Sequence, residues 1–259
     1  MSTNPIGIFD SGVGGTSIWK EVHQLLPHEN TIYLADSRNA PYGPKGKQAI
    51  IDLSVKNTEL LLSKGCKLIV VACNTATTNA IDYLRQHYEV PFIGIEPAIK
   101  PAALQTEHNA IGILATKGTL TSTLFSKTSE LYANGKTVIE QDGKGIVELI
   151  ESGELYSEAM RSLLESYLEP MLKVNIDYLV LGCTHYPYLI PVLQELLPQH
   201  VKIIDSGKAV AKQTKAVLER HGLLNTSTEK PKLKFYSNTD PKVMQSFLGD
   251  AFVAEYLEF

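Results

Sequence analysis

Short, continuously apolar runs alternate with longer helical patterns along this chain, and that alternation limits the folds open to it. Strands are expected over Ile6–Phe9, Thr31–Ala35 and Lys67–Ala72, with helices over Thr16–Leu26 and Lys47–Ser63 between them. Strands that are apolar on both faces are typical of a parallel sheet covered by helices on both sides. The sequence therefore predicts the α/β class, with doubly wound parallel sheets.

The same strand-and-turn pattern also occurs twice. The run 6–12 is echoed by 111–118, an offset of 105 from residue 6 to residue 111, and the run 68–75 is echoed by 178–185, an offset of 110 from Cys73 to Cys183. One similar pair could arise by chance because βα units resemble one another, but two pairs in the same order indicate two related halves. Pro91 and Pro97 punctuate the chain between them, which predicts a boundary near Glu96.

Composition excludes several classes of protein. Of 259 residues, 44% are hydrophobic and 20% charged, with 24 basic and 28 acidic side chains giving a net charge of −4. This balance does not favour a nucleic-acid partner or an anionic membrane surface. The apolar run Leu68–Cys73 is far shorter than the roughly 20 residues of a membrane helix, and Met1–Pro5 lacks the features of a signal peptide. Three cysteines, an odd number at spacings of 7 and 110, do not make a disulfide framework and fit a reducing compartment, so we expect a cytoplasmic protein.

Two of the cysteines occupy matching positions in the two halves. Cys73 and Cys183 each follow a predicted strand and precede a helix, where ligands bind in open α/β sheets and where the helix N-terminus favours a thiolate. A single cysteine in such a place is more often a buried structural residue. A matched pair favours a function, whereas Cys66, which has no counterpart, is interpreted as structural.

Several kinds of chemistry could use these thiols. A zinc site is not expected because the closely spaced ligand pairs of structural zinc sites are missing, and a redox pair would lack the C-x-x-C spacing. A thiol hydrolase could use Cys183 with His185, but it would leave Cys73 unexplained. Proton transfer at opposite faces of one carbon would use both thiols, one as base and the other as acid. Two related halves suit such an inversion of a stereocentre.

Two loops on the same predicted edge could contact a small ligand. The glycine-rich turn Asp10–Thr16 matches neither nucleotide-binding spacing, but its N–H groups could bind a carboxylate and Asp10 an ammonium group. A tight turn with a helix cap is the simpler alternative. The loop Pro41–Pro44 is stiffened by proline, while Gly43 allows close approach of a ligand. Together with the cysteines, it forms a plausible wall of a site.

These motifs resemble the cofactor-independent aspartate/glutamate racemase family. The resemblance is carried by Asp10–Gly15, Pro41–Gly43, Cys73–Thr75 and Gly182–Pro187, with Ile204–Ser206 later in the chain. It implies two α/β domains that face each other across the active site. The first would comprise residues 1–95 plus 208–259, and the second residues 96–207.

The resemblance also assigns roles to individual residues. Cys73 would exchange the proton on the D side of the substrate and Cys183 on the L side, with Asp10 and His185 assisting. The carboxylates and ammonium group of the substrate would be bound by Asp10, Ser11, Tyr42, Gly43, Asn74, Thr75, Thr184 and His185. Thr119 and Glu151 are further candidates. Glu148 is nearly as good a candidate as Glu151, because Asp142-Gly143-Lys144 stands where the family usually has Ala-Cys-Pro.

The expected activity is therefore an isomerase reaction that interconverts L- and D-glutamate and supplies D-glutamate for peptidoglycan synthesis. Neither a metal nor an organic cofactor is expected, and a homodimer is implied by the family alone. A racemase of aspartate or another acidic amino acid remains an alternative. A cysteine-dependent hydrolase or lyase, or a module that only binds an amino acid, is a more distant one.

Overall fold

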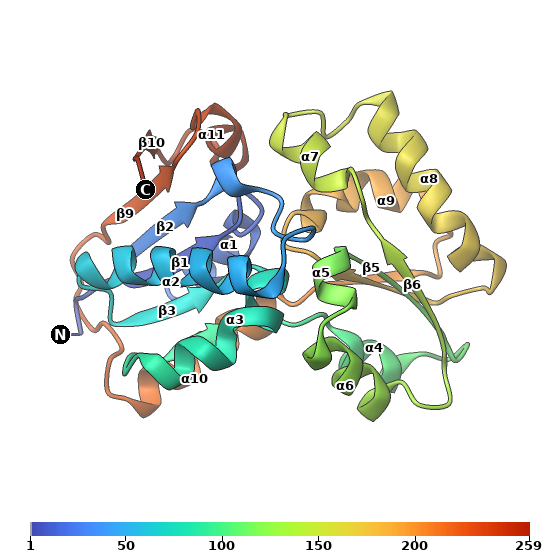
Figure 1. Ribbon diagram of the computed structural model, residues 1–259, viewed down its shortest axis with the longest axis horizontal. Helices are drawn as coiled ribbons and strands as arrows, with labels where there is room; N and C mark the ends of the chain where they lie inside the picture. The colour runs from blue at the N-terminus through green and yellow to red at the C-terminus, as the bar shows by residue number, and fades with distance from the viewer. Residues whose placement is uncertain (1) are drawn as a thin grey trace.

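The computed structural model describes residues 2–259 and arranges them around two parallel sheets, each within its own lobe (Figure 1). The first sheet has the strand order β10-β9-β2-β1-β3-β4 and the second β6-β5-β7-β8. The strands of the first sheet are β1 (Ile6–Asp10), β2 (Thr31–Ala35), β3 (Leu68–Val71), β4 (Phe92–Gly94), β9 (Leu233–Ser237) and β10 (Ala254–Tyr256). Those of the second are β5 (Ala110–Ala115), β6 (Thr137–Asp142), β7 (Tyr178–Gly182) and β8 (Lys202–Ile204).

The two sheets repeat one arrangement of four strands. The order β2-β1-β3-β4 in the first lobe matches β6-β5-β7-β8 in the second. The register matches as well, because Ile6 pairs with Leu68 in the first sheet and Ile111 pairs with Tyr178 in the second. These are the residues related by the sequence repeat. The prediction of two related α/β halves is confirmed.

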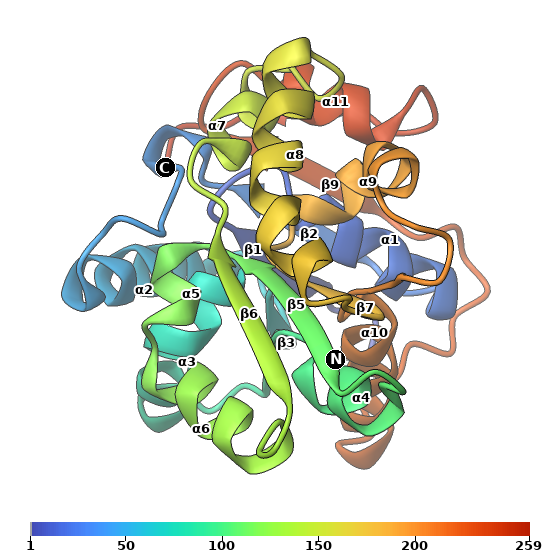
Figure 2. The same cartoon turned by 90° about the vertical axis from the view of Figure 1, so that its right-hand side faces the viewer.

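Helices cover both faces of each sheet, as predicted for a doubly wound fold (Figure 2). The helices are α1 (Thr16–Leu25), α2 (Lys47–Ser63), α3 (Asn74–His87), α4 (Ile99–Gln105), α5 (Lys117–Leu120), α6 (Thr123–Tyr132), α7 (Ile146–Glu151), α8 (Glu158–Lys173), α9 (Ile190–Leu196), α10 (Gly207–Arg220) and α11 (Lys242–Leu248). Two short 3₁₀ helices, η1 (Ser37–Asn39) and η2 (Tyr186–Leu189), follow β2 and β7. None of the helices within residues 2–259 is long and apolar enough to cross a bilayer.

Alternating side chains along the strands explain the two layers of helices. In β1, Phe9 packs with α2 and α3, whereas Ile8 packs with α1 and α10. In the second sheet, Ile113 faces α4 and α6, and Leu114 faces α7, α8 and α9. Successive side chains of a strand point to opposite faces, so a strand apolar at every position needs cover on both sides.

The predicted elements lie close to where the sequence placed them. The strand Thr31–Ala35 and the helix Lys47–Ser63 have the expected bounds, while the strand expected over Lys67–Ala72 is shorter by one residue at each end. Residues 6–94 and 233–256 supply the first sheet, and 110–204 the second. This membership supports the division into 1–95 plus 208–259 and 96–207, which we retain as a proposal.

Candidate active site

One small cavity lies between the lobes, at the carboxyl ends of the central strands. Its walls come from the residues that follow β1, β3, β5 and β7, from the loop after β2, and from the start of α7. The lining residues are Ser11, Pro41, Tyr42, Gly43, Cys73, Asn74, Thr75, Thr116, Val147, Cys183, Thr184 and His185. They include every residue to which the resemblance assigns a catalytic or substrate-binding role except Asp10, which is fully buried beside Ser11. The further candidates Thr119, Glu148 and Glu151 do not line the cavity.

Cys73 reaches this cavity from the first lobe as the N-cap of α3. Its sulfur accepts the N–H of Ala76 at 3.4 Å and lies 3.7 Å from the hydroxyl of Ser11. The free N–H groups and the dipole of a helix N-terminus stabilise negative charge on such a sulfur. Burial acts in the opposite direction and raises the pKa of the Cys73 thiol well above its usual value, helped by the nearby charge of Asp10. Burial therefore favours the neutral thiol form of Cys73.

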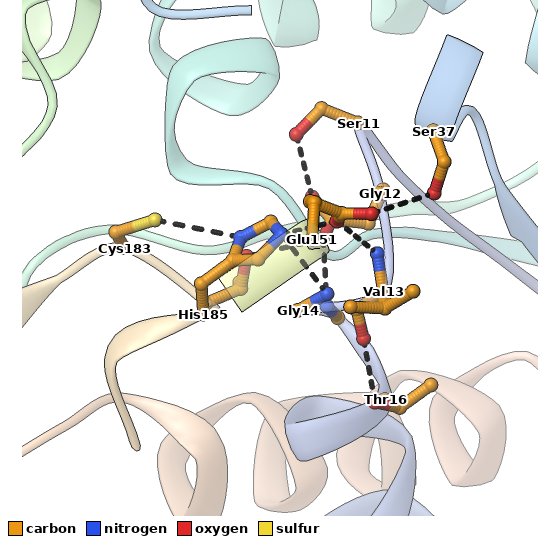
Figure 3. A network of polar contacts seen from close by, with 12 residues as sticks. Ser11, Gly12, Val13, Gly14, Thr16, Ser37, Glu151, Cys183 and His185 are labelled. Atoms are coloured by element: carbon orange, nitrogen blue, oxygen red, sulfur yellow. Dashed lines mark hydrogen bonds and ion pairs between the residues drawn. The ribbon is translucent and has the colours of Figure 1, made fainter. Parts of the chain in front are cut away.

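Cys183 lies in a different polar environment, in the second lobe. Its sulfur is 3.7 Å from Nδ1 of His185, and Nε2 of the same ring is 2.6 Å from Oε1 of Glu151 (Figure 3). Glu151 Oε1 also accepts the N–H of Val13 at 2.7 Å, and Oε2 accepts the hydroxyl of Ser37 at 2.9 Å. His185 thus bridges a carboxylate and the thiol sulfur.

The charges of this trio reinforce one another. Burial lowers the pKa of His185, but the hydrogen bonds with Cys183 and Glu151 outweigh burial and raise that pKa well above its usual value. Burial likewise acts to raise the pKa of Glu151, yet the bond to His185 leaves it lowered. His185 is consequently an imidazolium that lies between the Glu151 carboxylate and the Cys183 sulfur.

The glycine-rich turn holds Asp10 and brings the lobes together. Asp10 Oδ2 accepts the N–H of Gly15 at 2.6 Å and lies 3.2 Å from the hydroxyl of Thr184. Burial raises the pKa of Asp10, while the charge of His185 opposes this. The backbone N of Gly14 lies 3.3 Å from His185 Nε2, so the turn meets the second lobe directly.

Other predicted binding residues present polar groups in different ways. Both side-chain amide atoms of Asn74 are buried without a hydrogen-bond partner within residues 2–259, which leaves them for a ligand in the cavity. The hydroxyl of Thr75 lies 2.8 Å from that of Thr116 and 3.4 Å from that of Thr119, across the two lobes. The Tyr42 hydroxyl instead donates to Asp36 at 2.6 Å, so Tyr42 offers the cavity its ring and backbone rather than its hydroxyl.

Sequence reasoning left open whether Glu148 or Glu151 belongs to the site, and the geometry selects Glu151. Both lie on α7, but Glu148 is exposed, whereas Glu151 contacts His185, Val13 and Ser37. Ser37, Thr116 and Val147 were not expected near the site. The position of Ser37 two residues beyond the end of β2 was the available signal, because ligand sites form beyond the carboxyl ends of such strands.

The cavity is almost closed. It offers about 10 Å³ to the centres of water-sized molecules, which is room for about one water. The loop after β2 meets the second lobe where Gly43 and Gly118 touch, since a Cβ on Gly118 would lie 2.8 Å from the Gly43 carbonyl oxygen. The lobes must separate before an amino acid can enter.

Within residues 2–259, His, Cys, Asp and Glu side chains form no group of three or more suited to a metal ion.

Comparisons with known proteins show the family of the chain. A profile of the Asp/Glu/Hydantoin racemase family matches residues 11–214. A glutamate racemase of Herpetosiphon aurantiacus is 45% identical over 93% of this chain and 95% of its own length, and one of Ectopseudomonas mendocina is 46% identical over 96% and 94%.

Solved structures of glutamate racemases have the same fold as this chain. The glutamate racemase of Escherichia coli, crystallised with L-glutamate and an activator, superposes with a TM-score of 0.87 at 31% identity over 98% of both chains. That of Francisella tularensis, crystallised with D-glutamate, gives 0.85 at 29% identity over 100% of this chain and 98% of its own.

The fold and these relatives identify the protein as an amino-acid racemase, which is an isomerase. The chain belongs to the Asp/Glu/Hydantoin racemase family.

Proposed function

We propose that this protein interconverts L-glutamate and D-glutamate by proton transfer at Cα between two cysteines, without a cofactor. The observation that carries the proposal is the convergence of Cys73 and Cys183 on one cavity from equivalent positions of two related halves. A reaction whose substrate and product are mirror images needs a base on each face of one carbon. The relatives described above carry the same activity in their names, which supports glutamate as the substrate.

Because the surroundings of the two thiols differ, we assign them different protonation states at the start of the reaction with L-glutamate. The Cys183 sulfur, beside the His185 imidazolium, removes the Cα proton of L-glutamate as a thiolate. The Cys73 thiol then gives its proton to the opposite face of the planar carbanion, which yields D-glutamate. The enzyme is left with a Cys183 thiol and a Cys73 thiolate, which is the state that accepts D-glutamate in the reverse direction.

Negative charge that develops on the substrate carboxylate in this step must be stabilised by fixed donors. The Asn74 amide, the Thr75 and Thr184 hydroxyls and backbone N–H groups near Gly43 surround the cavity and are the donors we assign to it. Ser11 and Asp10 are assigned to the ammonium side. Preoriented donors in a site closed to water act more strongly than donors in solution.

The remaining elements of the proposal rest on the family alone. They are a role in supplying D-glutamate for peptidoglycan synthesis, a cytoplasmic location and a homodimeric assembly. Neither a metal ion nor an organic cofactor forms part of the proposed reaction.

Proton exchange followed by NMR tests the reaction and the substrate together. Protein freed of metals and small molecules is mixed in D₂O with L-glutamate, D-glutamate or either enantiomer of aspartate. We expect the Cα proton signal of both glutamate enantiomers to disappear while the opposite enantiomer forms. Racemisation of aspartate in preference to glutamate would mean that aspartate, not glutamate, is the substrate. A lack of exchange with all four compounds would refute the racemase proposal for these substrates.

Substitution of the cysteines separates the two-base reaction from a hydrolase at Cys183. Cys73→Ala is expected to abolish racemisation in both directions, because one face of the carbon loses its acid and base. Cys66→Ala is the matched control, since Cys66 is also buried but lies outside the cavity. Full racemase activity in Cys73→Ala would contradict the two-cysteine reaction.

A further inference from the structure

The segment that follows β2 connects the first lobe to the His185 trio. Ser37 opens η1, is half-buried, and donates its hydroxyl to Oε2 of Glu151 at 2.9 Å. It does not line the catalytic cavity. The contact of its side chain with the site is therefore the hydrogen bond to Glu151.

The two oxygens of Glu151 have separate partners. Oε1 contacts His185 and the N–H of Val13, whereas Ser37 provides the hydrogen bond to Oε2 among the described residues 2–259. The last torsion of a glutamate side chain is soft, so a free carboxylate turns easily about it. A donor on Oε2 fixes that torsion and keeps Oε1 directed at the imidazole.

Ser37 is itself held from both sides by one residue of the C-terminal segment. Asn238, which follows β9 and is fully buried, donates from Nδ2 to Asp36 Oδ1 at 2.6 Å. Its Oδ1 accepts the backbone N–H of Arg38 at 2.9 Å. Asn238 thereby fixes the residues immediately before and after Ser37.

We propose that Ser37, held in place by Asn238, is a positioning residue that fixes the Glu151 carboxylate against His185 and so keeps the imidazole beside the Cys183 sulfur. The series of contacts runs from β9 in the first lobe to β7 in the second. It lies on the Cys183 side of the site. On the other side, the Cys73 sulfur contacts the N–H of Ala76 and the hydroxyl of Ser11, which in turn contacts Asp10.

Titration of His185 by NMR tests this role without reference to catalysis. The groups facing His185 are Glu151 from α7, Asp10 from β1 and Cys183 after β7. The Ser37 hydrogen bond helps to lower the pKa of Glu151. Ser37→Ala should weaken the ion pair, so that the His185 midpoint moves to lower pH. The signal of His185 is assigned by its absence from a His185→Gln variant.

Kinetics provide the second readout, which rests on the proposed function. Ser37→Ala is expected to lower kcat about tenfold with KM little changed, as for loss of one hydrogen bond to a charged group. Ser37→Thr keeps the hydroxyl and should restore kcat and the His185 midpoint. Asn238→Ala should change both in the same direction as Ser37→Ala.

The matched control is Ser237→Ala, one residue before Asn238. Ser237 is also buried, but its hydroxyl contacts Thr239 and not the segment 36–39. An unchanged His185 midpoint in Ser37→Ala would overturn the proposal. Equal effects of Asn238→Ala and Ser237→Ala would overturn it for Asn238. If the wild-type protein failed to racemise glutamate, the proposed function would fall, while the His185 titration would still decide the role of Ser37.

Discussion

At the scale of single residues, the site depends on the different surroundings of two identical side chains. Cys73 is buried near Asp10 and capped by a helix N-terminus, whereas Cys183 faces an imidazolium. The sequence could predict Cys73, Cys183 and His185 because each lies at the carboxyl end of a strand. It could not select Glu151, because that choice depends on the face of α7 that turns toward the first lobe. This orientation is a tertiary contact, made with Val13 and Ser37.

Replacement of Glu151 by glutamine tests the charge on His185. The bonds to Glu151 and Cys183 raise the pKa of His185, so without the Glu151 carboxylate that pKa falls and the imidazolium loses its proton at lower pH. We expect the alkaline limb of the kcat–pH profile to move to lower pH and kcat to fall by about 10²-fold. Steady-state kinetics over a pH series measure both effects.

Glu148→Gln is the control on the same helix. This substitution removes the same charge, but Glu148 is exposed. Its profile should match that of the wild-type protein. A Glu151→Gln profile with an unmoved alkaline limb would show that another group sets the charge of His185.

At the scale of elements, the apolar runs and helical spacing locate the first three strands and the first two helices to within one residue at each end. The sequence repeat indicates that the two sheets share one strand order, but not what that order is. The composition of a strand does not show which strand lies beside it. The glycine-rich turn between β1 and α1 shows what is added by tertiary structure. Its sequence indicates a tight turn, but the reason for Gly14 is a close approach to the other lobe. A Cβ there would lie 2.3 Å from Nδ1 of His185 and 2.6 Å from its backbone N.

Gly14→Ala should therefore disturb the junction of the lobes. The added methyl group meets backbone as well as a ring, so the turn or His185 must shift. A displacement of about 1 Å at a catalytic group lowers activity by about 10²-fold, and we expect a loss of that order in the racemisation assay. Gly46→Ala is the control, because nothing lies within 4 Å of a Cβ at Gly46. Wild-type activity in Gly14→Ala would mean that the junction tolerates the displacement.

At the scale of the whole molecule, separate parts of the chain meet at one buried ion pair. Lys67, just before β3, contacts Glu29 at 2.6 Å with both side chains almost fully buried. Lys67 also donates to the carbonyl oxygens of Ser2 and Leu223, and Glu29 accepts the N–H of Asn225 at 2.7 Å. The composition gave no indication of this pair, because charge counts carry no information about which charges are buried.

Lys67→Ala is expected to destabilise the fold by about 3–5 kcal/mol, because it leaves the Glu29 carboxylate buried without its partner. Urea unfolding followed by circular dichroism measures the change. The control is Lys215→Ala, which removes an exposed pair with Glu219 at 3.9 Å and should alter stability by less than about 1 kcal/mol. A loss below 1 kcal/mol in Lys67→Ala would mean that water or other groups replace the lost partner.

The position of β9 beside β2 also determines the order in which the lobes are completed during synthesis on the ribosome. Domains generally fold as units while the chain emerges. All four strands of the second sheet lie between residues 110 and 204, whereas the first sheet still needs residues 233–256. Until those residues emerge, β2 has an open edge that another strand can occupy. The lobe that begins first is therefore finished last, and the edge of β2 stays exposed to pairing with other chains until β9 is made.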